Sequence, residues 1–258
     1  MYTRETMFSL TGKTAIVTGG SRGIGKVVAR HLAMMGADIA IVNTNAETGA
    51  QAAGEIEKTH KVKTKSFVCD VTKPNEVEST ISQIASDFGG LDVLFNNAGI
   101  CLHKAALDVS PEEWTRIFDV NTHGLFFMSR AFAKKLIELG RPGSIINNAS
   151  MSAEIVNLPQ EQVSYNASKA AVIHMTRSMA VEWVKHGIRV NCVSPGYIST
   201  DMSVLVRKDW TAKWEDMTPY GRMGNPEELS GAVIYLASDC SSFTSGANIV
   251  IDGLYSAV

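Results

Sequence analysis

The sequence of 258 residues has few of the features that mark secreted, membrane or nucleic-acid-binding proteins. Its four cysteines are scattered without a Cys-x-x-Cys pair, and its six histidines show no ligand spacing, so we expect neither disulfides nor a metal site. No run of about 18 apolar residues is present, which excludes an apolar membrane-spanning helix. The formal net charge of −2 gives no electrostatic basis for binding nucleic acid or an anionic membrane.

The N-terminus also lacks the apolar segment of a signal peptide, and together with the scattered cysteines this predicts a cytoplasmic protein. What the chain does have is a hydrophobic fraction of 45% over a length that suits one large α/β domain. No linker, repeat or low-complexity segment divides it. We therefore expect a single dinucleotide-binding catalytic domain spanning residues 1–258.

Short apolar runs alternate with helical patterns along the whole chain. Strands are predicted at residues 14–18, 38–42, 65–69, 91–95, 143–148, 188–193 and 247–251. Helices are predicted at residues 23–35, 46–58, 75–88, 111–139, 163–186 and 226–238. Apolar strands without alternation are typical of a parallel sheet buried on both faces. The order predicts one doubly wound, Rossmann-type α/β sheet of about seven strands with helices on both faces.

One long segment, residues 196–225, shows no regular pattern and is expected to be irregular. A loop of this length inside a compact domain is usually functional, and it carries apolar side chains such as Trp210, Trp214 and Tyr220. We expect this segment to form a substrate lid.

A glycine-rich turn at residues 18–25 joins the first predicted strand to the first helix. Its spacing is Gly-x-x-x-Gly-x-Gly rather than Gly-x-Gly-x-x-Gly. Glycines let the backbone approach phosphates, and the helix N-terminus offers free N–H groups and partial positive charge. A bound dinucleotide is therefore expected to contact Gly19, Ser21, Arg22, Gly23, Ile24 and Gly25.

The residues after the second and third predicted strands are expected to contact the adenosine half of such a ligand. The second strand is followed by Asn43, where an acidic residue would select NAD, and Arg22 suits a 2′-phosphate. We therefore expect NADP(H) to be favoured over NAD(H), with a bond from Asn43 to a 2′-hydroxyl as the alternative. Asp70 is placed to accept the adenine amino group, with Val71 against the ring; a turn-capping aspartate is an equal alternative.

Tyr165 and Lys169 lie four residues apart in a predicted helix, and so on one face. Free tyrosine has a pKa of about 10, and a neighbouring positive charge lowers it. The pair could therefore pass a proton to or from an alcohol or carbonyl oxygen. Alone the motif is weak, since a packed tyrosine beside a solvated lysine is the commoner arrangement.

Taken together, these motifs resemble the short-chain dehydrogenase/reductase family over about residues 8–253. The glycine turn matches its cofactor loop, Asn96-Asn97-Ala98-Gly99 its second signature, and Pro195-Gly196 its turn after the sixth strand. Its catalytic tetrad is matched by Asn121, Ser150, Tyr165 and Lys169.

The resemblance implies an NAD(P)-dependent oxidoreductase acting on CH–OH groups, in which Tyr165 exchanges the proton of an alcohol/carbonyl couple. Lys169 would lower the pKa of Tyr165 and hold the nicotinamide ribose, and the serine would hydrogen-bond the substrate oxygen. Asn121 would hold a water linking Lys169 to solvent. Cofactor contacts are further implied for Asn97, Ala98, Gly99, Pro195, Gly196 and Ile198.

The identity of the serine requires a choice. The commonest family spacing to the tyrosine would select Ser152, whereas the local pattern of serine, two residues, then glycine or alanine selects Ser150. We predict Ser150, with a slightly longer connection to Tyr165.

Residues 149–160 are similar to a subgroup acting on polyols and ketoses, which includes sorbose, mannitol and xylulose-type reductases. The segment offers polar side chains, and buried groups that pair with hydroxyls discriminate strongly for hydroxylated substrates. His103 is a further pocket candidate, although a lone surface histidine is the commoner case. Predicted substrate contacts are Ser150, Ser152, Glu154, Gln160 and Tyr165, with solvent exposure as the alternative for the loop residues.

Two other functions and an assembly state follow from the same residues. A 3-oxoacyl thioester reductase would need a basic patch, and Arg207, Lys208 and Lys213 are diluted by nearby acidic residues. A non-catalytic nucleotide sensor tends to lose the Tyr/Lys pair, which this chain retains. The long apolar helices predicted from residues 111 and 163 favour self-association, unless their apolar faces are core. The family resemblance implies a homotetramer, with a dimer as the alternative.

Overall fold

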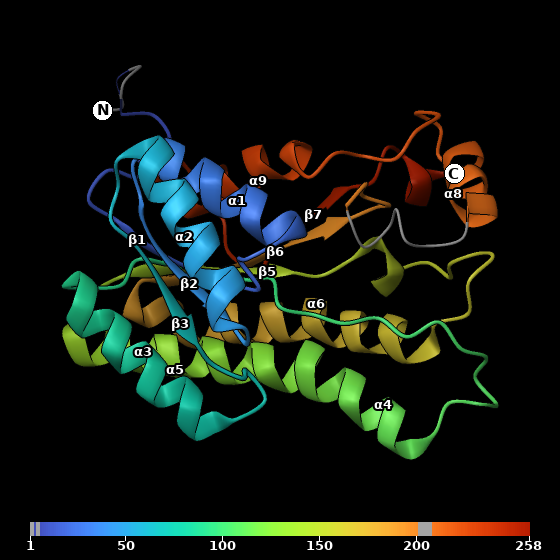
Figure 1. Cartoon of the computed structure of the whole chain (residues 1–258), viewed down its shortest axis with the longest axis horizontal. Helices are drawn as coiled ribbons and strands as arrows, with labels where there is room; N and C mark the ends of the chain where they lie inside the picture. The colour runs from blue at the N-terminus through green and yellow to red at the C-terminus, as the bar shows by residue number, and fades with distance from the viewer. Residues whose placement is uncertain (1–2, 4–5, 201–207) are drawn as a thin grey trace.

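The computed structural model describes residue 3 and residues 6–200 and 208–258, and these form a seven-stranded parallel sheet (Figure 1). Its strand order is β3-β2-β1-β4-β5-β6-β7. The predicted doubly wound fold class is confirmed. The strands are β1 (Thr14–Thr18), β2 (Asp38–Asn43), β3 (Thr64–Val68), β4 (Val93–Asn96), β5 (Gly143–Asn148), β6 (Ile188–Pro195) and β7 (Asn248–Ile251).

The strand order reverses beside β1, which pairs with β2 on one side and with β4 on the other. The chain first winds outward from β1 to β3 and then returns to β4 and continues the other way. Open α/β sheets bind ligands beyond the carboxyl ends of the strands at such a switch point. The segments that follow β1, β4 and β5 therefore meet where a ligand is expected.

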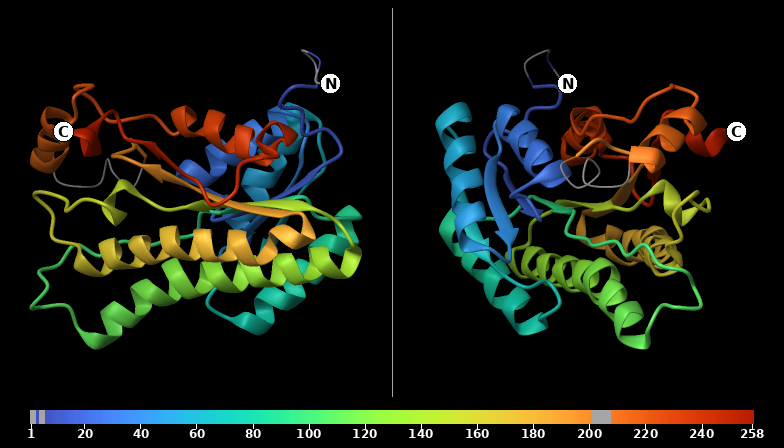
Figure 2. Two further views of the ribbon diagram at one scale, coloured as in Figure 1. Left: turned by 180° about the vertical axis from the view of Figure 1, so that it is seen from behind. Right: turned by 45° about the vertical axis from the view of Figure 1, so that its right-hand side comes forward.

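Helices cover both faces of the sheet (Figure 2). One face packs against α1 (Gly23–Met34), α2 (Ala46–His60) and α9 (Glu227–Ala237). The other packs against α3 (Pro74–Phe88), α5 (Leu125–Leu139) and α6 (Val163–Trp183), with α4 (Pro111–Phe118) preceding α5. None of the described helices is long and apolar enough to cross a membrane.

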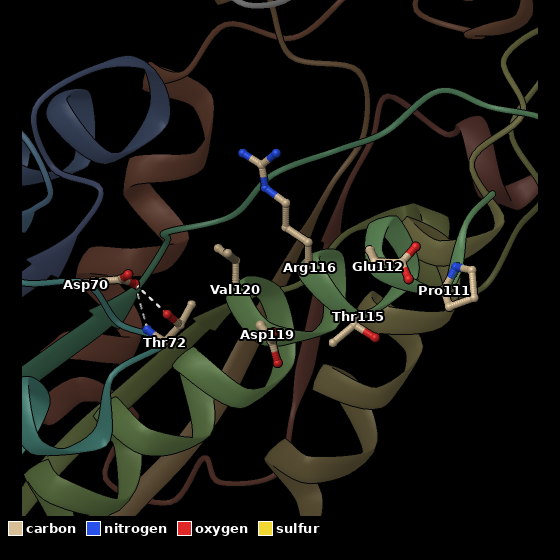
Figure 3. Close-up of a pocket in the computed structure, with 8 residues that line it drawn as sticks. All are labelled: Asp70, Thr72, Pro111, Glu112, Thr115, Arg116, Asp119 and Val120. Atoms are coloured by element: carbon tan, nitrogen blue, oxygen red, sulfur yellow. Dashed lines mark hydrogen bonds between the residues drawn. The ribbon is translucent and has the colours of Figure 1, made fainter.

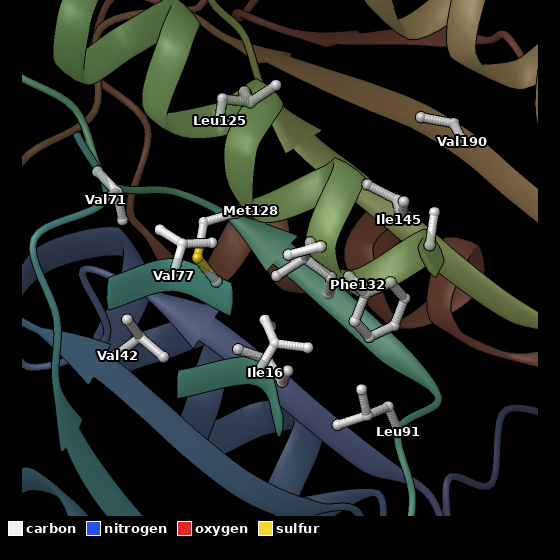
Figure 4. Close-up of a cluster of buried hydrophobic side chains, with 14 of the residues drawn as sticks. Ile16, Val42, Val71, Val77, Leu91, Leu125, Met128, Phe132, Ile145 and Val190 are labelled. Carbon is white, nitrogen blue, oxygen red and sulfur yellow. The ribbon is translucent and has the colours of Figure 1, made fainter. Parts of the chain in front are cut away.

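The apolar strands predicted from the sequence supply two cores, one on each side of the sheet. Ile16 of β1 lies in the core under α3, α5 and α6, whereas its neighbour Val17 lies in the core under α1 and α9. Figure 4 shows the first of these cores, where Met128 and Phe132 of α5 pack beside Ile16. Successive residues of a strand point to opposite faces, so uninterrupted apolar runs are required.

The predicted continuous helix at residues 111–139 is wrong in its middle. A π-helical turn, Asp119–Gly124, separates α4 from α5. Asn121 in this turn is held by the backbone of Ile100, a contact that the local sequence pattern does not reveal. A π-turn inserts a residue into a helix and shifts the direction of the side chains on either side of it.

Most other boundaries agree with the prediction to within two residues, and two larger differences remain. The helix expected at residues 163–186 ends as α6 at Trp183 and continues as a 3₁₀ turn to Gly187, whose φ of 72° stops it. The segment 196–225, expected to be irregular, contains the helix α8 (Lys208–Met217). Residues 201–207 of that expected lid lie outside the described residues.

Candidate active site

A series of hydrogen bonds joins the glycine turn to α6 across three strand ends. Asn97, after β4, donates from Nδ2 to the carbonyl oxygens of Thr18 and Gly19, at 3.1 and 3.3 Å. Asn148, at the end of β5, donates from Nδ2 to Asn97 Oδ1 at 3.0 Å. Lys169 of α6 donates from Nζ to the carbonyl oxygen of Asn148 at 2.6 Å. Residues far apart in sequence thus form one site.

The glycine turn fits a bound pyrophosphate. Gly19 and Gly23 have φ values of 64° and 53°, which glycine adopts at no steric cost. The N-terminus of α1 receives no hydrogen bond from a capping side chain among the described residues, and its first turn contains no acidic residue. Its N–H groups can therefore bind an anion. Half-buried Ser21 and Ile24 lie in the same turn.

Gly25 has a different role, because it lets α1 approach the strand ends closely. A Cβ at this position would overlap the carbonyl oxygen of Gly19 and lie 2.5 Å from Asn97 Nδ2. By contrast, a Cβ at Gly23 would have only Thr200 within 4 Å, at 3.9 Å. The turn is therefore packed tightly on the sheet side and open on the side where a phosphate would lie.

The residues predicted for the adenosine half lie at the ends of β2 and β3. The amide of Asn43 donates to the carbonyl of Asn45 and accepts a hydrogen bond from Ser66 at 3.1 Å. These two bonds within the chain fix the orientation of the Asn43 side chain. Arg22 is exposed and forms no ion pair with any residue that the structure describes, which leaves it available to a phosphate.

One carboxylate oxygen of Asp70 caps the turn that follows β3, as the turn-capping alternative predicts. Its Oδ1 accepts hydrogen bonds from the backbone N–H of Thr72 at 2.9 Å and from the Thr72 hydroxyl at 2.8 Å. Val71 beside it is buried and contacts Gly124, where a Cβ would lie 2.7 Å from a Val71 methyl. These contacts fix both residues at the carboxyl edge of β3.

A cavity of about 570 Å³ opens beside Asp70 and runs along α4 (Figure 3). In Figure 3 the side chain of Arg116 on α4 rises above Val120 of the following π-helical turn. The cavity provides room for a planar base next to Asp70. Its lining residues are Asp70, Thr72, Pro111, Glu112, Thr115, Arg116, Asp119 and Val120.

Tyr165 and Lys169 lie on one face of α6, as predicted. The Lys169 ammonium lies over the Tyr165 ring, 5.7 Å from its centroid. Burial lowers the pKa of Lys169 to about 8, so the group is mostly charged at neutral pH. Burial also raises the pKa of the Tyr165 phenol, and the nearby Cys101 thiol adds to this. In the chain alone, burial therefore outweighs the lowering of the phenol pKa expected from Lys169.

The structure separates the two candidate serines. Ser150 lies close enough to Tyr165 for its hydroxyl to oppose the burial effect on the phenol pKa. Its Oγ also accepts a 3.1 Å hydrogen bond from the backbone N–H of Ser152 at the start of a 3₁₀ turn. Ser152 Oγ instead accepts a 3.3 Å hydrogen bond from Gln162. Ser150 is therefore the serine beside the phenol.

Asn121 is buried and holds the segment after β4 against α6. Its Nδ2 donates to the carbonyl of Ile100 at 2.9 Å and to Ser168 Oγ at 3.1 Å, and its Oδ1 accepts from the Ile100 N–H at 2.8 Å. A Cβ at Gly99 would lie 3.3 Å from Asn121 Oδ1 and 3.8 Å from Lys169 Nζ. Two of the tetrad side chains, Asn121 and Lys169, thus lie on either side of the space beside Gly99.

Comparison with known proteins agrees with this geometry. A family model described as "Enoyl-(Acyl carrier protein) reductase" matches residues 19–256. A solved structure of a short-chain type dehydrogenase/reductase from Mycobacterium marinum is 44% identical, with a TM-score of 0.92 and 98% of each chain covered. The chain belongs to the short-chain dehydrogenase/reductase family.

Two curated proteins are similar in sequence to this dehydrogenase/reductase over most of its length. A probable NADP-dependent mannitol dehydrogenase from Yarrowia lipolytica is 44% identical over 250 residues, which are 96% of this chain and 89% of that protein. A sorbose reductase from Candida albicans is 43% identical over 251 residues, with the same two coverages.

Two residues predicted to contact substrate in this dehydrogenase/reductase have other partners. Gln160 donates from Nε2 to the Tyr197 hydroxyl and accepts from Trp214 Nε1, both at 2.9 Å. The exposed Glu154 accepts a 2.9 Å hydrogen bond from Asn248 of β7. The Gln160 amide and one carboxylate oxygen of Glu154 are therefore engaged within the chain itself.

The turn after β6 is shaped by close backbone packing. A Cβ at Gly196 would lie 2.6 Å from the Cα of Asp252, and the Gly196 N–H donates to the Ile251 carbonyl. Pro195 ends β6, and Ile198 forms an isolated bridge with Gly224. These contacts carry residues 195–198 past the end of the sheet, on the side of the glycine turn.

Sequence reasoning missed several residues of the site. Asn148 links Asn97 to Lys169, and its Oδ1 is buried without a hydrogen-bond partner among the described residues. Tyr197 stacks on Trp214 with ring centroids 4.3 Å apart and an angle of 8°. Position alone could have drawn attention to Asn148, the last residue of a predicted strand, whereas the aromatic stack joins segments with no shared pattern.

No group of His, Cys, Asp and Glu side chains in the described ranges is arranged to hold a metal ion.

Proposed function

We propose that this enzyme interconverts a secondary alcohol and a ketone with NADP(H), and that its substrates are a sugar polyol and its ketose. The bound nicotinamide supplies or accepts the hydride. The observation that carries the proposal is the contact of Ser150 and Lys169 with Tyr165 at the carboxyl edge of the sheet. The roles of the individual residues below are part of the proposal.

Side chains of the protein carry out the proton transfer. Tyr165 gives its phenolic proton to the carbonyl oxygen in reduction and takes it back in oxidation. The hydroxyl of Ser150 hydrogen-bonds the same substrate oxygen and stabilises its developing charge. The charged Lys169 stabilises the phenolate left after the transfer, because an ammonium near the ring favours the anionic form.

The preference for NADP(H) has two supports. No acidic residue stands at the end of β2, where Asn43 is followed by Thr44 and Asn45, so nothing there repels a 2′-phosphate. Arg22 is available at the N-terminus of α1, and a guanidinium binds phosphate well. The Yarrowia lipolytica relative is named as NADP-dependent, in agreement with this preference.

The substrate class rests on the relatives and on the polar segment before α6. The relatives are named for mannitol and sorbose, a polyol and a ketose. Asn157, Gln160 and Gln162 in this segment are buried and joined by hydrogen bonds. Because these amides bond one another and Tyr197, they order the segment, and the relatives are the main support for the substrate class.

Initial rates with NADPH and with NADH, over a panel of ketoses and their polyols, test the proposal. We expect turnover of at least one ketose and a clear preference for NADPH. An acetoacetyl thioester belongs in the panel, because the matching family model is described as an acyl-carrier-protein reductase. Faster turnover of the thioester than of every ketose would favour that function, and binding of NADPH without any turnover would favour a sensor.

We also propose that the chain is a single catalytic domain of residues 1–258 that forms a homotetramer in the cytoplasm. Trp114 of α4 and Phe126 of α5 are partly exposed aromatic side chains on the outer helical layer, which supports self-association. We also propose that segment 196–225 forms a substrate lid. The helix α8 and the stacking of Trp214 on Tyr197 in its described part support this role. Light scattering of the purified protein measures the assembly state, and a monomer would contradict the tetramer.

A further inference from the structure

Two side chains of the segment after Gly99 face the beginning of α6. Cys101 donates from Sγ to Gln162 Oε1 at 3.8 Å, and His103 lies close enough to Gln162 for this amide to affect the pKa of the imidazole. The backbone holds this arrangement, since the Lys104 N–H donates to the carbonyl of Glu161 at 2.8 Å. Residues two apart in an extended segment point the same way. Cys101 and His103 therefore form one wall.

One end of this wall lies at the reacting groups. The Cys101 thiol is close enough to Tyr165 and to Lys169 to affect the pKa of both. Desolvation raises the pKa of Cys101 to about 12, so the thiol stays protonated and unreactive at neutral pH. The wall thus leads from the phenol outward through Cys101 to His103.

Gln162 fixes the position of His103 but has no group left for a substrate. It is 6% exposed, and its Nε2 lies within hydrogen-bond distance of Ser152 Oγ, Asn157 Oδ1 and Asn166 Oδ1, at 3.3, 2.9 and 2.8 Å. An amide nitrogen has two hydrogens, so these three acceptors already exceed its capacity. Its oxygen accepts the hydrogen bond from the Cys101 thiol, and the amide lies beside His103.

His103 is the group of this wall that remains open to a ligand. Its residue is exposed, and within the described part of the chain no hydrogen bond reaches its second ring nitrogen. Trp210 of α8 lies edge-on to the imidazole, with ring centroids 5.3 Å apart and an angle of 75°. The imidazole is therefore held between α6 and α8 with one nitrogen available.

Burial lowers the pKa of His103, so the imidazole is neutral at neutral pH. A neutral imidazole donates through one nitrogen and accepts through the other, and both modes suit an alcohol. A carboxylate or phosphate group would instead bind best to a protonated, positively charged imidazole.

We propose that His103 determines substrate specificity by hydrogen-bonding a hydroxyl of the substrate chain at a carbon away from the reacting carbonyl. This inference rests on the proposed function and names a contact for its substrate class. A ketone without further hydroxyls cannot make this bond, so the residue separates polyhydroxylated substrates from simple ketones.

The test compares two substrates in three variants. We expect His103→Ala to lower kcat/KM for the best ketose by about four- to tenfold, mainly through KM, because one neutral hydrogen bond is lost. The same variant should turn over 2-hexanone, which has no hydroxyl, within about twofold of wild type. His103→Gln keeps a donor and an acceptor and should restore part of the ketose activity. His186→Ala, at the opposite end of α6, should match wild type.

The outcomes separate this inference from the proposed function. Equal losses on both ketones, or no loss on the ketose, would overturn the role of His103 while ketose turnover by wild type upholds the proposed function. Wild type that reduces 2-hexanone or an acetoacetyl thioester but no ketose would overturn the proposed function, and the His103 inference with it.

Discussion

The ammonium of Lys169 donates a 2.6 Å hydrogen bond to the carbonyl oxygen of Asn148, the last residue of β5. The side chain of Asn148 in turn binds Asn97, which binds the carbonyl oxygens of the glycine turn. The lysine beside the phenol and the loop that fits phosphates are therefore linked through three consecutive contacts. Changes at one end of this series should be felt at the other.

Replacing Tyr165 by Phe removes the proton donor and keeps the ring over which the Lys169 ammonium lies. We expect kcat to fall by about 10²- to 10⁴-fold, the range for loss of a general acid or base. NADPH binding, measured by fluorescence titration, should change little. A kcat within tenfold of wild type would show that another group transfers the proton.

Replacing Ser150 by Ala should lower kcat by about 10²-fold or more, since this hydroxyl lies beside the phenol. Replacing Ser152 by Ala is the matched control, and it should keep most of the activity because this hydroxyl serves Gln162. Steady-state rates with one ketose measure both. A Ser150 variant with nearly full activity, or a larger loss at Ser152, contradicts the assignment.

Replacing Gly25 by Ala places a methyl group against the carbonyl of Gly19 and the amide of Asn97. Such overpacking should lower the free energy of unfolding by about 1–3 kcal/mol and weaken NADPH binding. Gly54 of α2 has no atom within 4 Å of its would-be Cβ, so Gly54→Ala should instead stabilise by about 0.5–1 kcal/mol. Urea denaturation measures both; equal effects would refute the packing argument.

Replacing Arg22 by Ala should raise KM for NADPH by about tenfold or more and leave KM for NADH nearly unchanged. Lys26, one turn further along α1, is the control because its ammonium is already paired with Glu55 at 2.6 Å. Lys26→Ala should alter neither KM by more than about twofold. Parallel increases for both cofactors in the Arg22 variant would remove the basis for the NADP(H) preference.

The buried Lys169 makes stability depend on pH. Its pKa falls from 10.5 to about 8 in the folded chain, so above pH 8 the folded state has released a proton that the unfolded state still binds. The unfolded state binds more protons in this window, and the contribution of Lys169 to the free energy of unfolding therefore rises between pH 8 and 10.5.

Urea denaturation of wild type and Lys169→Met at pH 7 and pH 10 isolates this contribution. Groups that titrate in both proteins, such as Tyr165 and Cys101, largely cancel in the comparison. We expect wild type to gain up to about 2 kcal/mol relative to the variant between the two pH values. A constant difference would mean that Lys169 keeps its ordinary pKa.

The sheet and the glycine turn could be predicted because their signals are local. β5 lies at the predicted residues 143–148, since an apolar run bounded by Gly143 and Asn148 suffices to define it. The side on which each strand residue packs also follows from alternation, as Ile16 and Val17 show. The four-residue spacing of Tyr165 and Lys169 within a predicted helix also placed them on one face.

What could not be predicted depends on contacts between distant residues. The partners of Gln160 are 37 and 54 residues away, so the sequence could not reveal that its amide is already engaged. The phenol pKa follows from burial, which a motif does not report; only the neighbouring charge was visible. The helix α8 lies in a segment of mixed polar and aromatic residues whose order comes from packing.

The π-turn Asp119–Gly124 determines how the side chains of α4 are rotated about the helix axis relative to those of α5. An α-helix turns by about 100° per residue, so one extra residue rotates everything before it relative to everything after it. Asn121 can therefore face Ile100 and Ser168 while Met128 and Phe132 stay in the core. Deleting a single residue here would misalign the whole of α4 with respect to the site, even though no contacting side chain had been changed.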